Sequence, residues 1–150
     1  ANIEGIAVKA GKIFLGFRAP SIDGSAFIME VDANAVFATG AIEATVHPVR
    51  LGKDVGIRDL AAVQSGLLIL AGPAPDVPPA TETTEVDYPV FHWDGKSPDV
   101  KPLGRLGSVP KIGKPETLLV LDESDPRHYR ALVLIESIDN ARPTQYAIPR

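Results

Sequence analysis

Three carboxylates recur at nearly even spacing along the chain. Glu4, Asp59 and Glu116 are separated by 55 and 57 residues, and each stands at the start of an apolar run. Carboxylates that converge on one point could hold Ca²⁺, a hard cation that prefers oxygen ligands. Such an ion would orient a phosphate or polarise a carbonyl. The alternative is structural, with each acid bonding to backbone N–H groups or to a nearby arginine, and repetition along the chain favours this alternative.

Two arginines accompany these acids. Arg18 ends the first apolar run and Arg58 directly precedes Asp59. Guanidinium groups bind carboxylate or phosphate through two parallel hydrogen bonds, so Arg18 and Arg58 are candidates for seating an anion. Pairing with the acids inside the protein is the simpler alternative. Neighbouring residues of a regular strand point to opposite faces, so Arg58 and Asp59 should not both enter one site.

The elements that must position these side chains have the character of strands. Short apolar runs are bounded by turn residues and are too continuous for half-exposed strands, so they predict strands buried on both faces. The runs are 11–17, 25–31, 65–72, 117–121 and 130–137. Residues 57–63 have a helix as their alternative. Residues 72–89 lack periodicity and predict an extended, exposed loop.

An internal repeat connects the strands with the acids. Residues 4–18 align with 59–73 without a gap, placing Glu4 on Asp59 and matching Ala7, Val8, Gly11 and Leu15 with identical residues. A third copy begins at 116–121 and resumes at 130–137 after a hairpin tip at 122–129. The second halves repeat more faintly, at 26–32, 88–94 and 143–149.

Three units of about four short strands each are typical of a β-propeller, whose blades stack sheet upon sheet. We therefore predict an all-β fold, a partial β-propeller in one domain, with blade-like units at approximately 2–54, 55–112 and 113–150. A β-sandwich or barrel is the alternative fold. In a propeller the innermost strands line a central channel. The predicted site is thus the channel mouth, with ligand-binding residues Glu4, Arg18, Arg58, Asp59 and Glu116 and a metal option at Glu4, Asp59 and Glu116.

Composition excludes several classes of protein. The net charge of −4 argues against nucleic-acid binding, which needs a basic surface. The chain has no cysteine, so it forms neither a disulfide framework nor a thiolate zinc site. No apolar run is long enough for a membrane span. A soluble protein is expected, either in the bacterial cytoplasm or exported, and the start at Ala1 suggests a processed or truncated product.

Residues 2–20, 56–75 and 114–121 resemble repeat segments of a bacterial family of unknown function. That family is similar to the esterase-like phytase β-propellers, in which "EGIA" opens an inner strand. The resemblance covers nearly the whole chain and implies the C-terminal portion of a propeller. It leaves two functions open: a ligand-binding or scaffolding domain, or a metal-assisted phosphoester or ester hydrolase using Ca²⁺ at Glu4, Asp59 and Glu116.

A partial propeller implies a partner. Its first and last blades expose apolar sheet faces, and such faces require a cover. The remainder of a longer parent chain is one candidate. A second copy is the other, because two three-unit chains would form a six-bladed homodimeric ring with two-fold symmetry.

Overall fold

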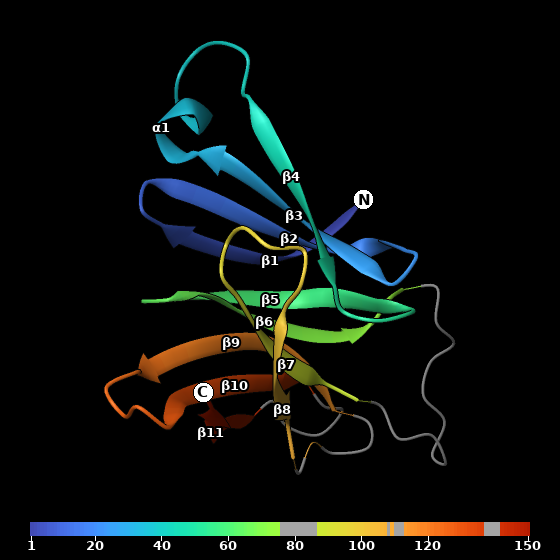
Figure 1. Cartoon of the computed structure of the whole chain (residues 1–150), viewed down its shortest axis with the longest axis vertical. Coiled ribbons are helices and arrows are strands. Elements are labelled where there is room, and N and C mark those ends of the chain that lie inside the picture. The colour runs from blue at the N-terminus through green and yellow to red at the C-terminus, as the bar shows by residue number, and fades with distance from the viewer. Residues whose placement is uncertain (76–86, 108, 110–112, 137–141) are drawn as a thin grey trace.

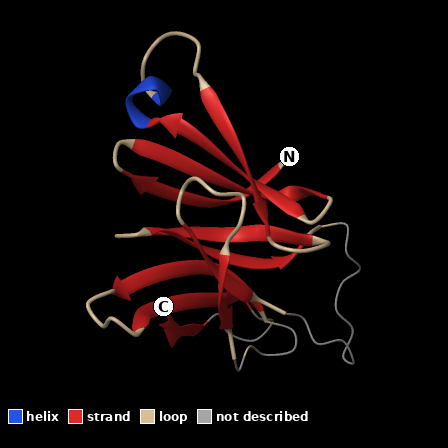
Figure 2. Cartoon of the chain, viewed as in Figure 1, coloured by secondary structure: helices blue, strands red, loops and turns tan. Residues whose placement is uncertain are grey.

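The computed structural model describes residues 1–75, 87–107, 109, 113–136 and 142–150 and has three antiparallel sheets (Figure 1). Strands dominate the described part, and one short helix lies at the edge of the first sheet (Figure 2). The predicted all-β class is confirmed. No helix among the described residues has the length and apolar character needed to cross a bilayer.

The first sheet is a four-stranded meander in chain order, drawn in blue and cyan in Figure 1. Its strands are β1 (Asn2–Lys9), β2 (Lys12–Ile22), β3 (Ser25–Asp32) and β4 (Ala44–Arg50). Helix α1 (Ala33–Val36) follows β3, and the Asp32 carboxylate caps it by accepting the backbone N–H groups of Asn34 and Ala35. The expected strands in residues 11–32 are confirmed.

The second sheet repeats this meander with four strands. These are β5 (Val55–Val63), β6 (Gly66–Pro73), β7 (Pro89–Trp93) and β8 (Lys101–Arg105). The helix alternative for residues 57–63 is wrong, because this segment pairs with β6 along its length. The central part of the loop predicted at 72–89, residues 76–86, lies outside the described residues.

Among the described residues the third sheet has three strands, whereas about four were predicted for each unit. Its strands are β9 (Lys114–Asp122), β10 (His128–Glu136) and β11 (Arg142–Pro149). The hairpin tip predicted at 122–129 connects β9 to β10, and the strand predicted at 143–149 is β11.

The second sheet lies between the other two, as the vertical order in Figure 1 shows. One buried core joins the first sheet to the second and includes Phe14, Ile28 and Ile69. Another joins the second sheet to the third and includes Leu70, Leu118 and Val133. Strand β5 contacts both β1 and β9. Three stacked sheets therefore enclose two separate apolar layers.

This stacking corrects the expectation that every apolar run is buried on both faces. Only the middle sheet fits it, with seven consecutive buried residues in β6. In β1 and β10, buried residues alternate with exposed ones. The reason is that a terminal sheet has a neighbour on one side only.

The sheets stack in one sense along the chain. We call the side of a sheet that faces the next sheet in chain order its leading face, and the opposite side its trailing face. The first sheet packs its leading face, which includes Ala7 and Phe14, on the trailing face of the second, which includes Leu60 and Ile69. The second sheet in turn packs Ala61 and Leu68 of its leading face on the third. Corresponding faces are thus used at both junctions.

Close approach of β5 to β2 requires a glycine at position 56. A Cβ atom added to Gly56 would overlap the carbonyl oxygen of Arg18. Backbone cannot retreat as a flexible side chain can, so the sheets would have to move apart. Gly107 makes a matched comparison, because an added Cβ there meets nothing within 4 Å.

We expect Gly56→Ala to lower the free energy of unfolding by about 1–3 kcal/mol, the usual cost of overpacking a well-packed interior. Urea unfolding followed by circular dichroism measures this change. Gly107→Ala is the control and should leave the midpoint nearly unchanged. Equal stability of the two variants would contradict the close packing of β2 against β5.

Candidate functional site: an ion-paired cluster at the first strands

The first strand of each sheet contains a β-bulge at a corresponding position. In each case the pairing with the next strand skips one residue, which then stands outside the regular alternation of faces. The skipped residues are Glu4 in β1, Arg58 in β5 and Glu116 in β9. A bulge redirects its side chain, and these three side chains form one cluster.

The hairpin registers correct the alignment that placed Glu4 on Asp59. Counted from the turn of each hairpin, Glu4 corresponds to Arg58, and Asp59 corresponds to Gly5. The sequence alignment matched Gly11 with Gly66, but these glycines differ in structure. Gly11 lies in the turn after β1, whereas Gly66 is the first residue of β6. The equivalent charged positions are therefore Glu4, Arg58 and Glu116.

Arg58 is the centre of the cluster and is almost fully buried, with 3% of its side chain exposed. Its Nε donates to the carbonyl oxygen of Pro115 at 3.0 Å, and its Nη2 donates to the Glu116 carboxylate. Its Nη1 lies 3.8 Å from Oε2 of Glu4. One guanidinium of the middle sheet thus contacts the first strands of both neighbouring sheets.

Arg18 completes the cluster from β2. Its Nη1 donates to Oε1 of Glu4 at 2.9 Å, and its Nε donates to the carbonyl oxygen of Pro73 at 3.1 Å. Asn2 also donates to the same Glu4 oxygen. Arg18 and Arg58 therefore each place Nε on a backbone carbonyl of the following sheet. Both arginines pair with Glu4, so the charged groups of this cluster pair with each other inside the protein.

Asp59 binds main chain rather than arginine. Its Oδ2 accepts the N–H of Leu118 at 2.7 Å. Burial raises the pKa of Asp59 above its ordinary value, and interactions of the carboxylate with the backbone N–H groups of Leu118, Leu60 and Ile6 oppose the rise. Ile6 and Leu118 each lie two residues beyond a bulge. Asp59 thus ties β1 and β9 to β5 at corresponding positions.

The structure brings Glu4, Arg18, Arg58 and Glu116 into one ion-paired cluster and places Asp59 beside it. Both glutamates contact an arginine, and Asp59 accepts N–H groups. Within the described ranges, no group of three or more His, Cys, Asp or Glu residues is arranged to hold a metal ion. Ca²⁺ binding by Glu4, Asp59 and Glu116 stays a prediction.

Sequence reasoning missed Tyr88, which precedes β7. Tyr88 is buried, and burial raises the pKa of its phenol while Arg58 opposes the rise. A Cβ added to Gly72 would lie 2.7 Å from Cδ of Arg58 and 3.0 Å from the Tyr88 ring. Gly72 therefore makes room for the arginine and the aromatic ring. The faint repeat sets Tyr88 opposite Ala26, so no shared residue type pointed to it.

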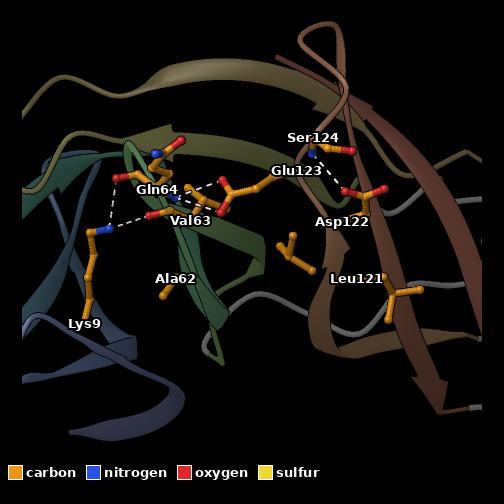
Figure 3. A pocket seen from close by; sticks show the side chains of 9 residues that line it. Lys9, Ala62, Val63, Gln64, Leu121, Asp122, Glu123 and Ser124 are labelled. Carbon is orange, nitrogen blue, oxygen red and sulfur yellow. Dashed lines mark hydrogen bonds between the residues drawn. The ribbon is translucent and has the colours of Figure 1, made fainter.

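A second polar contact set lies at the opposite ends of the first strands, where the hairpins turn (Figure 3). Lys9 donates through Nζ to the carbonyl oxygens of Val63 and Gln64, at 2.5 and 3.0 Å. Glu123 accepts the N–H of Gln64 with both carboxylate oxygens, at 2.9 and 3.1 Å. These residues border a cavity of about 790 Å³ between the hairpin ends of β5 and β9. Lys9 and Glu123 are occupied with backbone, so their contacts join the three hairpins.

A family model described as "Protein of unknown function (DUF3616)" matches residues 1–147. No curated protein and no solved structure matches the chain.

We expect Arg58→Lys to lower the free energy of unfolding by about 3–5 kcal/mol, the typical cost of breaking a buried ion pair. A lysine amine cannot reproduce the fork that contacts Pro115, Glu116 and Glu4 together. Chemical denaturation measures the change. Arg50→Lys is the matched control, because Arg50 pairs with Asp99 at the surface, where such pairs contribute about 0–1 kcal/mol. Similar losses in both variants would contradict the central role of Arg58.

We expect the stability of the wild type relative to Asp59→Asn to fall as the pH rises from about 4. The folded-state pKa of Asp59 lies above its ordinary value of 3.8, so the folded chain binds this proton more tightly than the unfolded chain. Ionisation therefore costs folding free energy across the window between the two pKa values. Denaturation at a series of pH values measures the difference. A difference that is constant with pH, or that rises, would contradict the raised pKa.

Proposed function

We propose that this chain, which belongs to the DUF3616 family of proteins of unknown function, acts as a binding or scaffolding module. The module would be a segment of a β-propeller. It would carry no chemistry of its own. Its three sheets would provide a rigid frame, and its outer surfaces would contact a ligand or partner. The proposal treats the cluster around Arg58 as part of the frame.

The stacking of the sheets supports the propeller arrangement. Each sheet is an antiparallel meander, and each packs its leading face on the trailing face of the next. First strands β1 and β9 both contact β5, and the Asp59 carboxylate interacts with backbone N–H groups at equivalent positions of the two, Ile6 and Leu118. Convergence of first strands on a shared axis is typical of propellers.

The observation that carries the proposed function is the way Arg58 is used. Its three donor groups face Pro115, Glu116 and Glu4, which belong to the two neighbouring sheets. Arg18 is likewise occupied by Glu4 and Pro73. Charges that pair with each other stabilise a frame and leave little for a substrate. The hydrolase that the phytase-like resemblance implies would instead need carboxylates free for a metal or a water.

Calcium separates the scaffolding proposal from the hydrolase alternative. We expect millimolar CaCl₂ to leave the melting temperature unchanged, because an ion that does not bind the folded state gives no stabilisation by mass action. We also expect no hydrolysis of p-nitrophenyl phosphate in the presence of CaCl₂. A calcium-dependent rise in melting temperature that is lost in both Glu4→Gln and Glu116→Gln would overturn the proposal in favour of the hydrolase.

Hydrogen exchange tests the frame itself. The amide protons of Ile6 and Leu118 should exchange slowly in the wild type and faster in Asp59→Ala, since the carboxylate that binds the Leu118 N–H and interacts with the Ile6 N–H is removed. Asp99→Ala is the control, because Asp99 is exposed and pairs with Arg50 of the first sheet and with its own loop, away from the first strands. Unchanged protection of both amides in Asp59→Ala would contradict a frame held at Asp59.

A further inference from the structure

The two outer faces of the stack carry apolar side chains that are exposed in the part of the chain that the structure describes. On the trailing face of the first sheet, Ile6 is 59% exposed and Val8 60%. On the leading face of the third sheet, Leu119 is 53% exposed and Leu134 43%. Two contiguous apolar faces at the ends of a stack indicate interaction surfaces.

These exposed residues occupy positions that the middle sheet buries. Ile6 corresponds through the hairpin register to Leu60, which is 3% exposed. Leu134 corresponds to Leu70, which is completely buried. The outer faces therefore have the same character as faces that pack inside the chain and lack only a neighbour.

The junction between the second and third sheets indicates which neighbour would fit. There Leu70 of a leading face and Leu118 of a trailing face share one core. The residues at the same positions on the two free faces are Leu134 and Ile6. At the first junction the corresponding pair is Gly16 and Leu60, and a Cβ added to Gly16 would lie 3.2 Å from the Leu60 side chain. The two free faces thus carry residues of the same kind, at the same positions, as the two faces that pack at the second junction.

We infer that a second copy of this chain covers both faces. The leading face of the third sheet of one copy docks on the trailing face of the first sheet of the other. The same contact repeats through a two-fold axis and closes a dimer of six sheets. This inference rests on the propeller arrangement proposed above, since closure needs the sheets to turn about a common axis.

The junction between copies differs from the internal junctions at the axis. Inside the chain, Arg58 lies between Glu4 and Glu116. At the junction between copies, Glu116 of one copy would lie beside Glu4 of the other without Arg58 between them. The position equivalent to Asp59 is Thr117 in the third sheet, so the junction also lacks that carboxylate. We therefore expect the dimer to dissociate on dilution before the sheets unfold.

Light scattering after size-exclusion chromatography tests this inference. The wild type should have twice the chain mass of 15.9 kDa. Ile6→Asp and Leu134→Lys should each have the mass of one chain, because either substitution places a charge in both junctions of the dimer. A mixture of the two variants should regain the double mass. Its mixed dimer has one unaltered junction and one junction in which the two substituted side chains, of opposite charge, would face each other.

Phe37→Asp is the control, because Phe37 is 86% exposed but follows α1 and belongs to no strand of either face, and this variant should remain dimeric. Circular dichroism should show that all variants are folded, since the substituted side chains are exposed in the single chain. A wild type with the mass of one chain would overturn the inference, as would larger open assemblies. A dimer that is disrupted by Leu134→Lys but not by Ile6→Asp would also overturn the inference, because it would indicate that the leading faces of the two third sheets dock on each other.

Hydrogen exchange at Ile6 and Leu118 distinguishes the two proposals. If Asp59→Ala speeds the exchange of both amides but the wild type has the mass of one chain, the inferred dimer is wrong and the proposed frame stands. If Asp59→Ala releases neither amide, the frame itself fails.

Discussion

A guanidinium withdrawn from water must find acceptors for its donors, and in this protein Arg58 finds them on the strands of two neighbouring sheets. Burial of an unpaired charge is far more costly than any single surface contact. The position of Arg58 is tolerable only because Pro115, Glu116 and Glu4 surround it. Those groups belong to the first and third sheets, so satisfying the charge and stacking the sheets are one requirement.

The backbone makes this arrangement possible through its bulges. A regular strand alternates its side chains between two faces, and both faces of β5 are occupied by apolar layers. The extra residue at each bulge leaves this alternation and directs a polar side chain toward the neighbouring first strands. Asp59 then resumes the alternation and uses its carboxylate for the amides of Ile6 and Leu118. Two adjacent polar residues thereby serve different partners.

Sequence patterns predicted the strands and their hairpins, because apolar runs of this length between turn residues suit strands better than helices. They also identified the five charged residues that meet at the first strands. The bulges could not be predicted, since one extra residue in a strand leaves no compositional trace. The alignment was shifted by one position for a different reason: it matched Gly11, which lies in the turn after β1, with Gly66, the first residue of β6, and so it matched Asp59 with Glu4 in place of Arg58. The acid pattern suggested a metal site, whereas the register gives an alternation of acid, base and acid. Tyr88 and Gly72 were missed because their roles depend only on where the Arg58 side chain lies in the folded protein.

The hairpin ends constrain the chain in another way. Lys9 and Glu123 hold the turn after β5 by its main-chain atoms at residues 63 and 64, and neither uses the Gln64 side chain. Position 64 of this turn can therefore change its amino acid, yet the turn cannot change its length. One inserted residue would carry the carbonyls away from Lys9 and the amide away from Glu123 in a single step. Related sequences should therefore vary in the amino acid at position 64 but should have no insertion or deletion in the turn after β5.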